Sequence, residues 1–172
     1  MHARHVLALA VALALAVGLA GCLDSPSSGP NAPPGNESFT VEMTGNSTHS
    51  VYVATHLYTE RPESVTLEYA NGTTREFELP TEQGLVQGSA PDGLRSVATP
   101  EDDGGVYFEG PPAFTASANE IAPMETVVFV VRVDGSDQVA AWGVANCDGH
   151  VDRVTLDATG RTVTVGGLAC SN

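Results

Sequence analysis

The feature that most constrains the fold is an alternation of apolar and polar side chains with a period of two residues. In 65–69, Val, Leu and Tyr alternate with Thr and Glu, and the same pattern recurs at 39–43, 154–157 and 162–165. Successive side chains of a strand point to opposite faces, so this period is typical of strands with one buried and one solvated face. No stretch shows the 3.6-residue apolar period of an amphipathic helix. The pattern predicts an all-β domain.

Two segments differ because both of their faces are apolar. Residues 125–133 and 138–145 are joined by Asp134-Gly-Ser-Asp137, which has the composition of a hairpin loop. Strands that are apolar on both faces belong in the middle of a sheet system. A four-residue loop pairs Phe129 with Trp142 on one face, which predicts that both rings lie together at the centre of the core.

Two further hairpins are indicated by glycine-containing turns. Thr159-Gly160 predicts a two-residue loop that pairs Leu156 with Val163. Asn71-Gly72 is the strongest short hairpin signal in the chain. At this turn a tight loop and the apolar pattern favour different registers, so we expect a β-bulge near 73–75.

The remaining pattern predicts one domain over residues 38–172. Alternating strands with turn residues between them favour an antiparallel β-sandwich of about seven to nine strands with an immunoglobulin-like architecture. Residues 80–105 interrupt the pattern with three prolines and five glycines. Long segments without periodicity are often functional, so this is where we would first expect a binding loop.

The N-terminus has the organisation of a lipoprotein signal. Residues 1–21 form a predicted signal peptide, in which the apolar run 6–19 is shorter than the ~20 residues that span a bilayer. Leu19-Ala-Gly-Cys22 resembles a lipobox, which predicts cleavage before Cys22 and a lipid on its sulfur. Residues 22–37 are rich in Pro, Ser and Gly and predict a tether. The alternative is an uncleaved membrane helix or an ordinary signal peptide.

The composition is strongly acidic. The chain has 21 acidic residues, seven arginines and no lysine, for a formal net charge of −14; loss of Arg4 with the signal makes it −15. Together with the lipobox, this composition resembles the lipoproteins of extremely halophilic archaea as a class, and an ordinary acidic surface protein is the alternative. The resemblance implies a lipid-anchored protein on the outer face of the cell membrane. Nucleic acid is disfavoured as a partner because nothing basic is present to neutralise phosphates.

Cys147 and Cys170 are an even pair in a predicted extracellular domain, which favours a disulfide. Cys147-Asp-Gly-His150 also allows a second reading, a blue-copper centre with His56 or His49 as the third ligand. No methionine follows His150 to supply the usual axial thioether. The disulfide is therefore the preferred interpretation.

The other candidate sites are weaker. Glu101, Asp102 and Asp103 have the oxygen ligands that Ca²⁺ prefers, but the alternating ligand spacing of an EF-hand loop is missing. No nucleophile elbow, zinc-protease helix or phosphate loop occurs. Three sequons offer N-glycosylation acceptors at Asn36, Asn46 and Asn71.

These observations favour a non-enzymatic binding or cell-envelope module. It would be held to the membrane by the lipid on Cys22, would need no cofactor, and would take a protein or a glycan as its ligand. A small blue-copper-like electron carrier and a surface hydrolase are the alternative functions.

Overall fold

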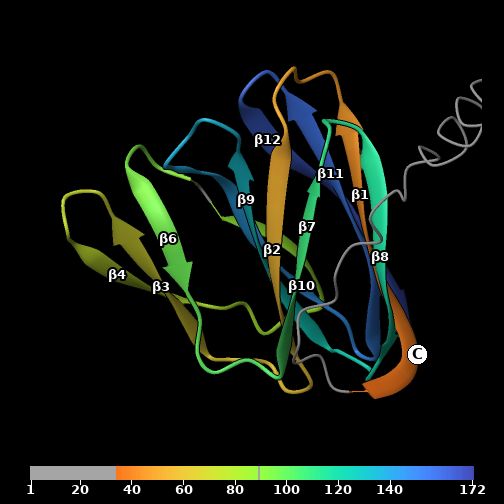
Figure 1. The fold of residues 1–172 in the computed structure, drawn as a ribbon. Helices are drawn as coiled ribbons and strands as arrows, with labels where there is room; N and C mark the ends of the chain where they lie inside the picture. The colour runs from red at the N-terminus through yellow and green to blue at the C-terminus, as the bar shows by residue number, and fades with distance from the viewer. Residues whose placement is uncertain (1–33, 89) are drawn as a thin grey trace, which may run out of the picture.

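The computed structural model describes residues 34–88 and 90–172, which form twelve strands and no helix. The strands make three sheets stacked in three layers, with sheet A between sheets B and C (Figure 1). The predicted all-β sandwich is confirmed, although the described residues contain more strands than expected. Immunoglobulin-like connectivity stays a prediction. In the described part of the chain, no helix is long and apolar enough to cross a membrane.

Sheet A is the central layer, and it contains two neighbouring strands that are buried on both faces. These two interior strands come from the segments that the sequence assigned to the middle of the sheet system, so that prediction is confirmed. In spatial order the strands are β5 (Gly84–Gly88), β10 (Val139–Asn146), β9 (Thr126–Val133), β2 (Val51–Tyr58) and β7 (Gly104–Gly110).

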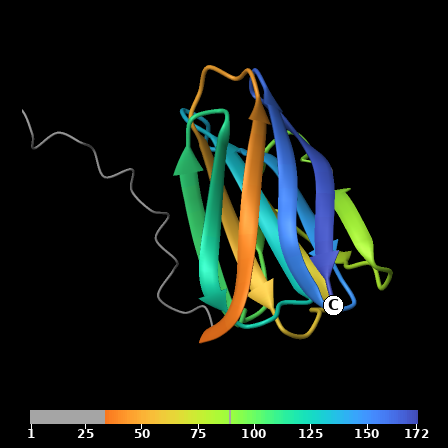
Figure 2. The ribbon, with the colours of Figure 1, turned by 90° about the vertical axis from the view of Figure 1, so that its right-hand side faces the viewer.

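Sheet B covers one face of sheet A. It is seen face-on in Figure 2, and it contains one parallel pair, between β1 and β11, among antiparallel neighbours. In spatial order the strands are β12 (Thr162–Ser171), β11 (His150–Thr159), β1 (Pro34–Gly45) and β8 (Phe114–Ile121). The first four residues of β1, 34–37, therefore lie in the segment 22–37 that was predicted to be a tether. An irregular start at Pro34 and Glu37, both opposite Ile121, explains how a Pro- and Gly-containing stretch joins the sheet.

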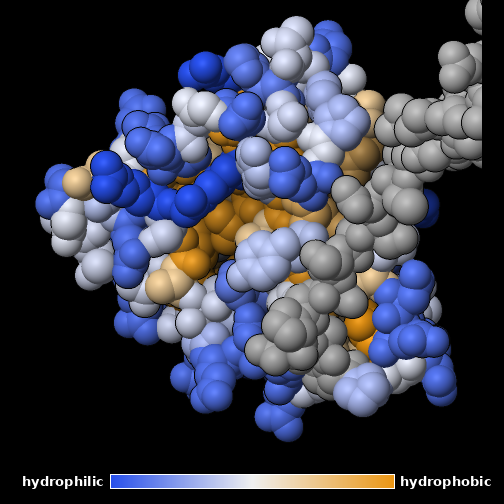
Figure 3. All heavy atoms as spheres, in the orientation of Figure 1, coloured by the Kyte–Doolittle hydropathy of each residue, from blue (hydrophilic) through white to orange (hydrophobic). Residues whose placement is uncertain are grey.

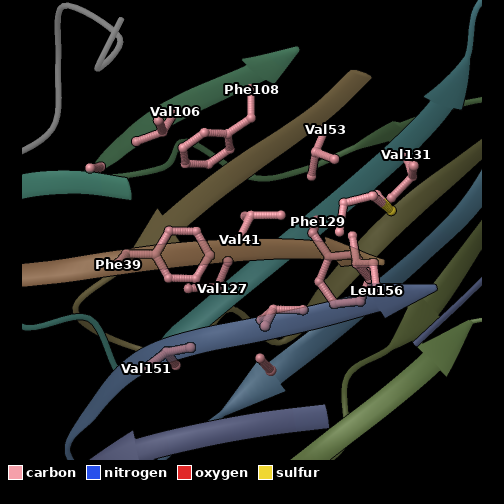
Figure 4. Close-up of a cluster of buried hydrophobic side chains, with 14 of the residues drawn as sticks. Phe39, Val41, Val53, Val106, Phe108, Val127, Phe129, Val131, Val151 and Leu156 are labelled. Carbon is pink, nitrogen blue, oxygen red and sulfur yellow. The ribbon is translucent and has the colours of Figure 1, made fainter. Parts of the chain in front are cut away.

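The main hydrophobic core lies between sheets A and B (Figure 4). Phe39 of β1 and Phe108 of β7 meet across it with ring centroids 6.2 Å apart. Such tilted aromatic contacts add to the stabilisation from buried area. The largest fully buried side chains of this core include Phe39, Met43, Leu57, Phe108, Ile121, Met124, Phe129 and Leu156.

Sheet C covers part of the other face of sheet A and encloses a second, smaller core. Its strands are β4 (Thr74–Glu78), β3 (Ser64–Tyr69) and β6 (Leu94–Ala98). Trp142 of β10 is the largest side chain of this core and makes an edge contact with Phe77, with ring centroids 5.1 Å apart. Leu94 and Val97 of β6 close the core from the opposite side.

The predicted pairing of Phe129 with Trp142 is wrong. An irregularity between Val139 and Ala141 shifts the β9–β10 register by one residue, so that Trp142 lies opposite Val130. A shift of one residue moves every later side chain to the other face of a strand. Both rings are buried as predicted, but Phe129 packs in the main core and Trp142 in the second core.

The two glycine turns form hairpins, but with registers that differ from those expected. The loop at the C-terminal hairpin is Gly160-Arg161, and Leu156 pairs with Val165 instead of Val163. Gly160 has φ 62°, which suits the first position of a type II′ turn. At the Asn71-Gly72 hairpin the loop is longer than two residues, and Gly72 within it has φ 80°. The pairing across 74–78 is regular, so the prediction of a bulge near 73–75 is wrong.

Residues 80–105 are not the long loop that the sequence predicts. They contain β5, at the edge of sheet A, and β6, at the edge of sheet C. Both strands have five residues, and β5 begins at Gly84 and ends at Gly88. Strands this short give too little alternation to be recognised from a pattern, and the two glycines of β5 add no side chain to it.

Candidate ligand-binding groove

Sheet C is narrower than sheet A, and this difference leaves a groove. The second core contains side chains of β9 and β10, whereas the outward faces of β2 and β7 stay largely uncovered. A groove of about 1280 Å³ lies there, lined by β2, β7, β9 and the free edge of β6. Figure 3 shows an apolar hollow rimmed by hydrophilic side chains on this face. Small-molecule pockets are usually ~300–1,000 Å³, so the groove has room for an oligomeric ligand.

Two tyrosine rings lie in the floor of the groove. Tyr52 of β2 is 39% exposed and Tyr107 of β7 is 61% exposed, and they are the exposed large hydrophobic side chains of the described residues. In the β2–β7 register Tyr52 lies opposite Glu109, and Ala54 lies opposite Tyr107. The two tyrosines are therefore diagonal neighbours on one face, at a spacing of roughly 7–8 Å between backbones.

The Tyr52 end of the groove carries charge. The Glu109 carboxylate, with help from Asp134, raises the pKa of Tyr52 above its usual value. The phenol hydroxyl is protonated at neutral pH, as tyrosine ordinarily is, and it is hydrogen-bonded to the Glu109 carboxylate beside it. Arg132 of β9 reaches across to sheet C, where its Nη2 donates to the backbone oxygen of Arg95 at 2.6 Å. This bond ties the β6 edge to the floor of the groove.

A histidine–carboxylate pair lies at the other end. His56 Nδ1 is 2.6 Å from Asp102 Oδ2, and both side chains are partly exposed. Thr99 Oγ1 is 3.3 Å from the same ring nitrogen. Below them, Tyr58 is buried and its hydroxyl donates to the Pro100 oxygen at 3.2 Å. Burial raises the pKa of Tyr58 to about 12.

This pair orients His56 but does not by itself form a catalytic site. In a nucleophilic triad, the carboxylate accepts from one ring nitrogen while the nucleophile faces the other. Here the nearby hydroxyl of Thr99 lies on the nitrogen that also faces Asp102. Ser96 lines the groove, but its hydroxyl is hydrogen-bonded to Glu68. The arrangement can present His56 Nε2 to a ligand as a hydrogen-bonding group.

No protein-family model, curated protein or solved structure matches this chain. The groove must therefore be interpreted from its own residues. Sequence reasoning missed Tyr52, Tyr107 and Arg132, although one signal was present. Each tyrosine stands at the outward position between two apolar residues, in Val51-Tyr-Val53 and Val106-Tyr-Phe108, where an alternating strand normally carries a polar side chain.

The predicted disulfide is confirmed. Cys147 and Cys170 are bonded, with a Cα–Cα distance of 5.8 Å. Cys147 directly follows β10 of sheet A, and Cys170 lies in β12 of sheet B. The disulfide therefore links the two sheets of the main core covalently at one end.

The residues of the copper alternative do not come together. The Cys147 sulfur is in the disulfide and so is not a free thiolate. His150 Nδ1 accepts from the Met124 amide at 3.0 Å, and its Nε2 is 2.9 Å from the Ser38 oxygen. His56 belongs to the groove face of sheet A, turned away from sheet B. Across residues 34–88 and 90–172, no three His, Cys, Asp or Glu side chains are grouped to hold a metal ion.

The acidic run 101–103 has local roles. Asp102 faces His56, and Asp103 Oδ2 accepts from the Thr59 amide at 2.6 Å and from its hydroxyl at 2.7 Å. Glu101 is exposed. These bonds tie the loop before β7 to the end of β2, and the three carboxylates do not converge on one point.

The sequon asparagines are all exposed. Asn36 lies in β1, and Asn46 directly follows it. Asn71 Oδ1 accepts from the amide and hydroxyl of Thr73, at 3.0 and 2.7 Å, so it shapes the β3–β4 turn. Glycosylation stays a prediction. The signal peptide 1–21 and the lipidation site Cys22 lie outside the described residues.

Proposed function

We propose that this chain is a non-enzymatic binding module, anchored by a lipid on Cys22 to the outer face of the cell membrane, which holds its ligand in the groove between sheets A and C. The observation that carries the proposal is the open groove with Tyr52 and Tyr107 in its floor. Exposed apolar surface that is contiguous and rimmed by polar residues often marks a ligand-binding groove. A rigid sheet supports both rings, so little order is lost on binding.

The sequence supports the anchoring half of the proposal. A short apolar run followed by Leu-Ala-Gly-Cys22 is typical of a lipoprotein signal. A disulfide between Cys147 and Cys170 suits an oxidising compartment outside the membrane. Because the domain is acidic, basic residues cannot assist attachment, and stable anchoring then needs more than one acyl chain.

Footprinting tests the groove. Hydroxyl radicals are applied to intact cells and to the purified full-length protein, and tyrosine oxidation is quantified by mass spectrometry. We expect Tyr107 to be reactive in the purified protein and protected on cells. A Thr115→Tyr variant supplies a matched exposed ring on β8 of sheet B, which should react equally in both samples. Equal oxidation of Tyr107 on cells and after purification would contradict a ligand in the groove.

Intact mass spectrometry of the protein from native membranes tests the anchor. We expect a chain that starts at Cys22 and carries a lipid-sized mass excess. A Cys22→Ala variant should lose that excess. An unmodified Cys22 in the membrane-bound protein would contradict the lipid anchor without bearing on the groove.

A further inference from the structure

We propose that the ligand of the groove is a neutral glycan, which stacks on Tyr107 and Tyr52 and is hydrogen-bonded at the two polar ends of the groove. This inference rests on the proposed function and names the chemical class of its ligand. Sugar rings have an apolar C–H face and a rim of hydroxyl groups. A site for them needs exposed aromatic faces flanked by donors and acceptors, and the groove combines both.

The two tyrosines lie on neighbouring strands, where they offer two separate aromatic faces to one extended ligand. Tyr107 and Tyr52 are diagonal neighbours on adjacent strands, so their rings can contact successive units of one oligomer and not opposite sides of a single one. Both are fixed on a sheet whose other face packs in the main core. Aromatic side chains provide large contact area at low entropic cost because they have only two rotatable bonds.

The polar groups at the ends match hydroxyl ligands. At one end the Glu109 carboxylate and the Tyr52 hydroxyl that is hydrogen-bonded to it offer acceptor oxygens. At the other end Asp102 fixes the ring of His56 through Nδ1. A sugar hydroxyl both donates and accepts, so it can be satisfied by any of these groups.

Charge selects a neutral glycan over an acidic one. Glu109 and Asp134 flank Tyr52, and the chain carries a formal net charge of −14. Arg132, the cation of the groove lining, already donates to the Arg95 oxygen. A uronic acid or sulfate group would therefore meet like charge without a dedicated partner, which disfavours its binding.

An extended peptide is the competing occupant, because β6 is an edge strand that could accept another strand. Arg132 opposes this mode. Its guanidinium occupies the Arg95 carbonyl, which a docked strand would need for its own ladder. β6 also has only five residues, which leaves few free backbone groups for pairing.

The test measures binding of oligosaccharides to the full-length lipidated protein in a sugar-free polyoxyethylene detergent. The probes are hexasaccharides of α-glucose, β-glucose, N-acetylglucosamine and mannose, with a uronic-acid hexasaccharide as the acidic control. Saturation-transfer NMR detects contact, and calorimetry measures Kd. We expect at least one neutral probe to bind saturably with magnetisation transfer from tyrosine ring protons to sugar C–H groups, and the acidic probe to bind at least tenfold more weakly.

Variants locate the binding. Tyr107→Ala should raise Kd at least tenfold, whereas Tyr107→Phe keeps the ring and should stay within about threefold of wild type. Thr115→Ala, on sheet B, is the control and should leave Kd unchanged. Circular dichroism melting verifies that each variant is folded.

Three results would overturn the proposal: no neutral probe binds, Tyr107→Ala binds as wild type does, or the acidic probe binds best. If Tyr107 is nevertheless protected on cells, the groove remains a binding site for another class of ligand, such as a peptide, and only the glycan is wrong. If Tyr107 is not protected on cells either, the binding groove itself is wrong.

Discussion

Gly88 lies opposite Trp142 in the β5–β10 pair, and a Cβ placed on Gly88 would overlap the indole ring. The glycine therefore lets the largest side chain of the second core lie flat against the edge strand. With a side chain at this position, either β5 or the indole ring would have to move. The sheet edge and the packing of Trp142 consequently depend on one another.

Gly88→Ala should destabilise the protein by about 1–3 kcal/mol, because an overpacked site forces the ring or the strand to move. Gly167→Ala is the matched control, since a Cβ there would meet Thr155 atoms only at 3.9 Å. Urea denaturation of both variants measures the difference. A Gly88→Ala protein as stable as the control would show that the ring is not held against β5.

Alternation predicted the existence and burial of most strands, but it did not predict the register of β9 and β10. The irregularity between Val139 and Ala141 inserts no residue of special chemistry; the segment is Val-Ala-Ala. Nothing in those side chains distinguishes a regular strand from a bulged one. Because the side-chain period is two, this single step sent Phe129 and Trp142 to different cores.

The groove could not be predicted from the sequence for a different reason. It exists because the three strands of sheet C leave β2 and β7 uncovered, and that depends on the order of strands in space. Tyr52 and Tyr107 are 55 positions apart in the sequence, and only the β2–β7 pairing brings them together. The disulfide was predictable because an even pair of cysteines in a predicted extracellular domain favours a bond without any knowledge of the strand order.

Removing the disulfide should cost about 3 kcal/mol, the loop-closure entropy for a closed loop of this size. The two cysteines are 23 residues apart and join sheets A and B. A Cys147→Ala, Cys170→Ala double variant tests this by chemical denaturation. The wild-type protein in reducing agent is the companion sample and should lose a similar amount. An unchanged free energy of unfolding in both samples would mean that the disulfide does not constrain the unfolded chain.

Stability should fall at alkaline pH because of Tyr58. Burial raises its pKa to about 12, whereas an unfolded chain has a tyrosine pKa near 10. The raised value means that the folded state keeps the proton longer. Protonated Tyr58 therefore makes its full contribution to the free energy of unfolding below about pH 10. That free energy falls by roughly 2–3 kcal/mol as the pH rises towards 12. Tyr58→Phe should flatten this decline in denaturation midpoints measured from pH 9 to 12. An unchanged slope in the variant would assign the decline to other groups.

Stability should also depend on salt. The formal net charge is −14, and the described residues contain just two ion pairs, His56–Asp102 and the exposed Arg153–Glu42. Few cations therefore compensate the repulsion among the carboxylates. The screening length for that repulsion is about 3 Å at 1 M salt and ~30 Å at 0.01 M, so the repulsion is much stronger at low salt. We expect the melting temperature to fall by roughly 4–8 °C, equivalent to about 2 kcal/mol, between 2 M and 10 mM KCl.

Salt also strengthens apolar burial, so a charge variant is needed to separate the two effects. Glu60, Glu82 and Asp92 are exposed acidic residues away from both ion pairs. The variant Glu60→Gln, Glu82→Gln, Asp92→Asn removes three negative charges while keeping side-chain size. If repulsion causes the salt dependence, this variant should melt higher than wild type at 10 mM KCl and nearly equally at 2 M. Parallel melting curves for both proteins across the salt range would instead assign the dependence to apolar burial, and the acidic composition would then have no role in the folded state's response to salt.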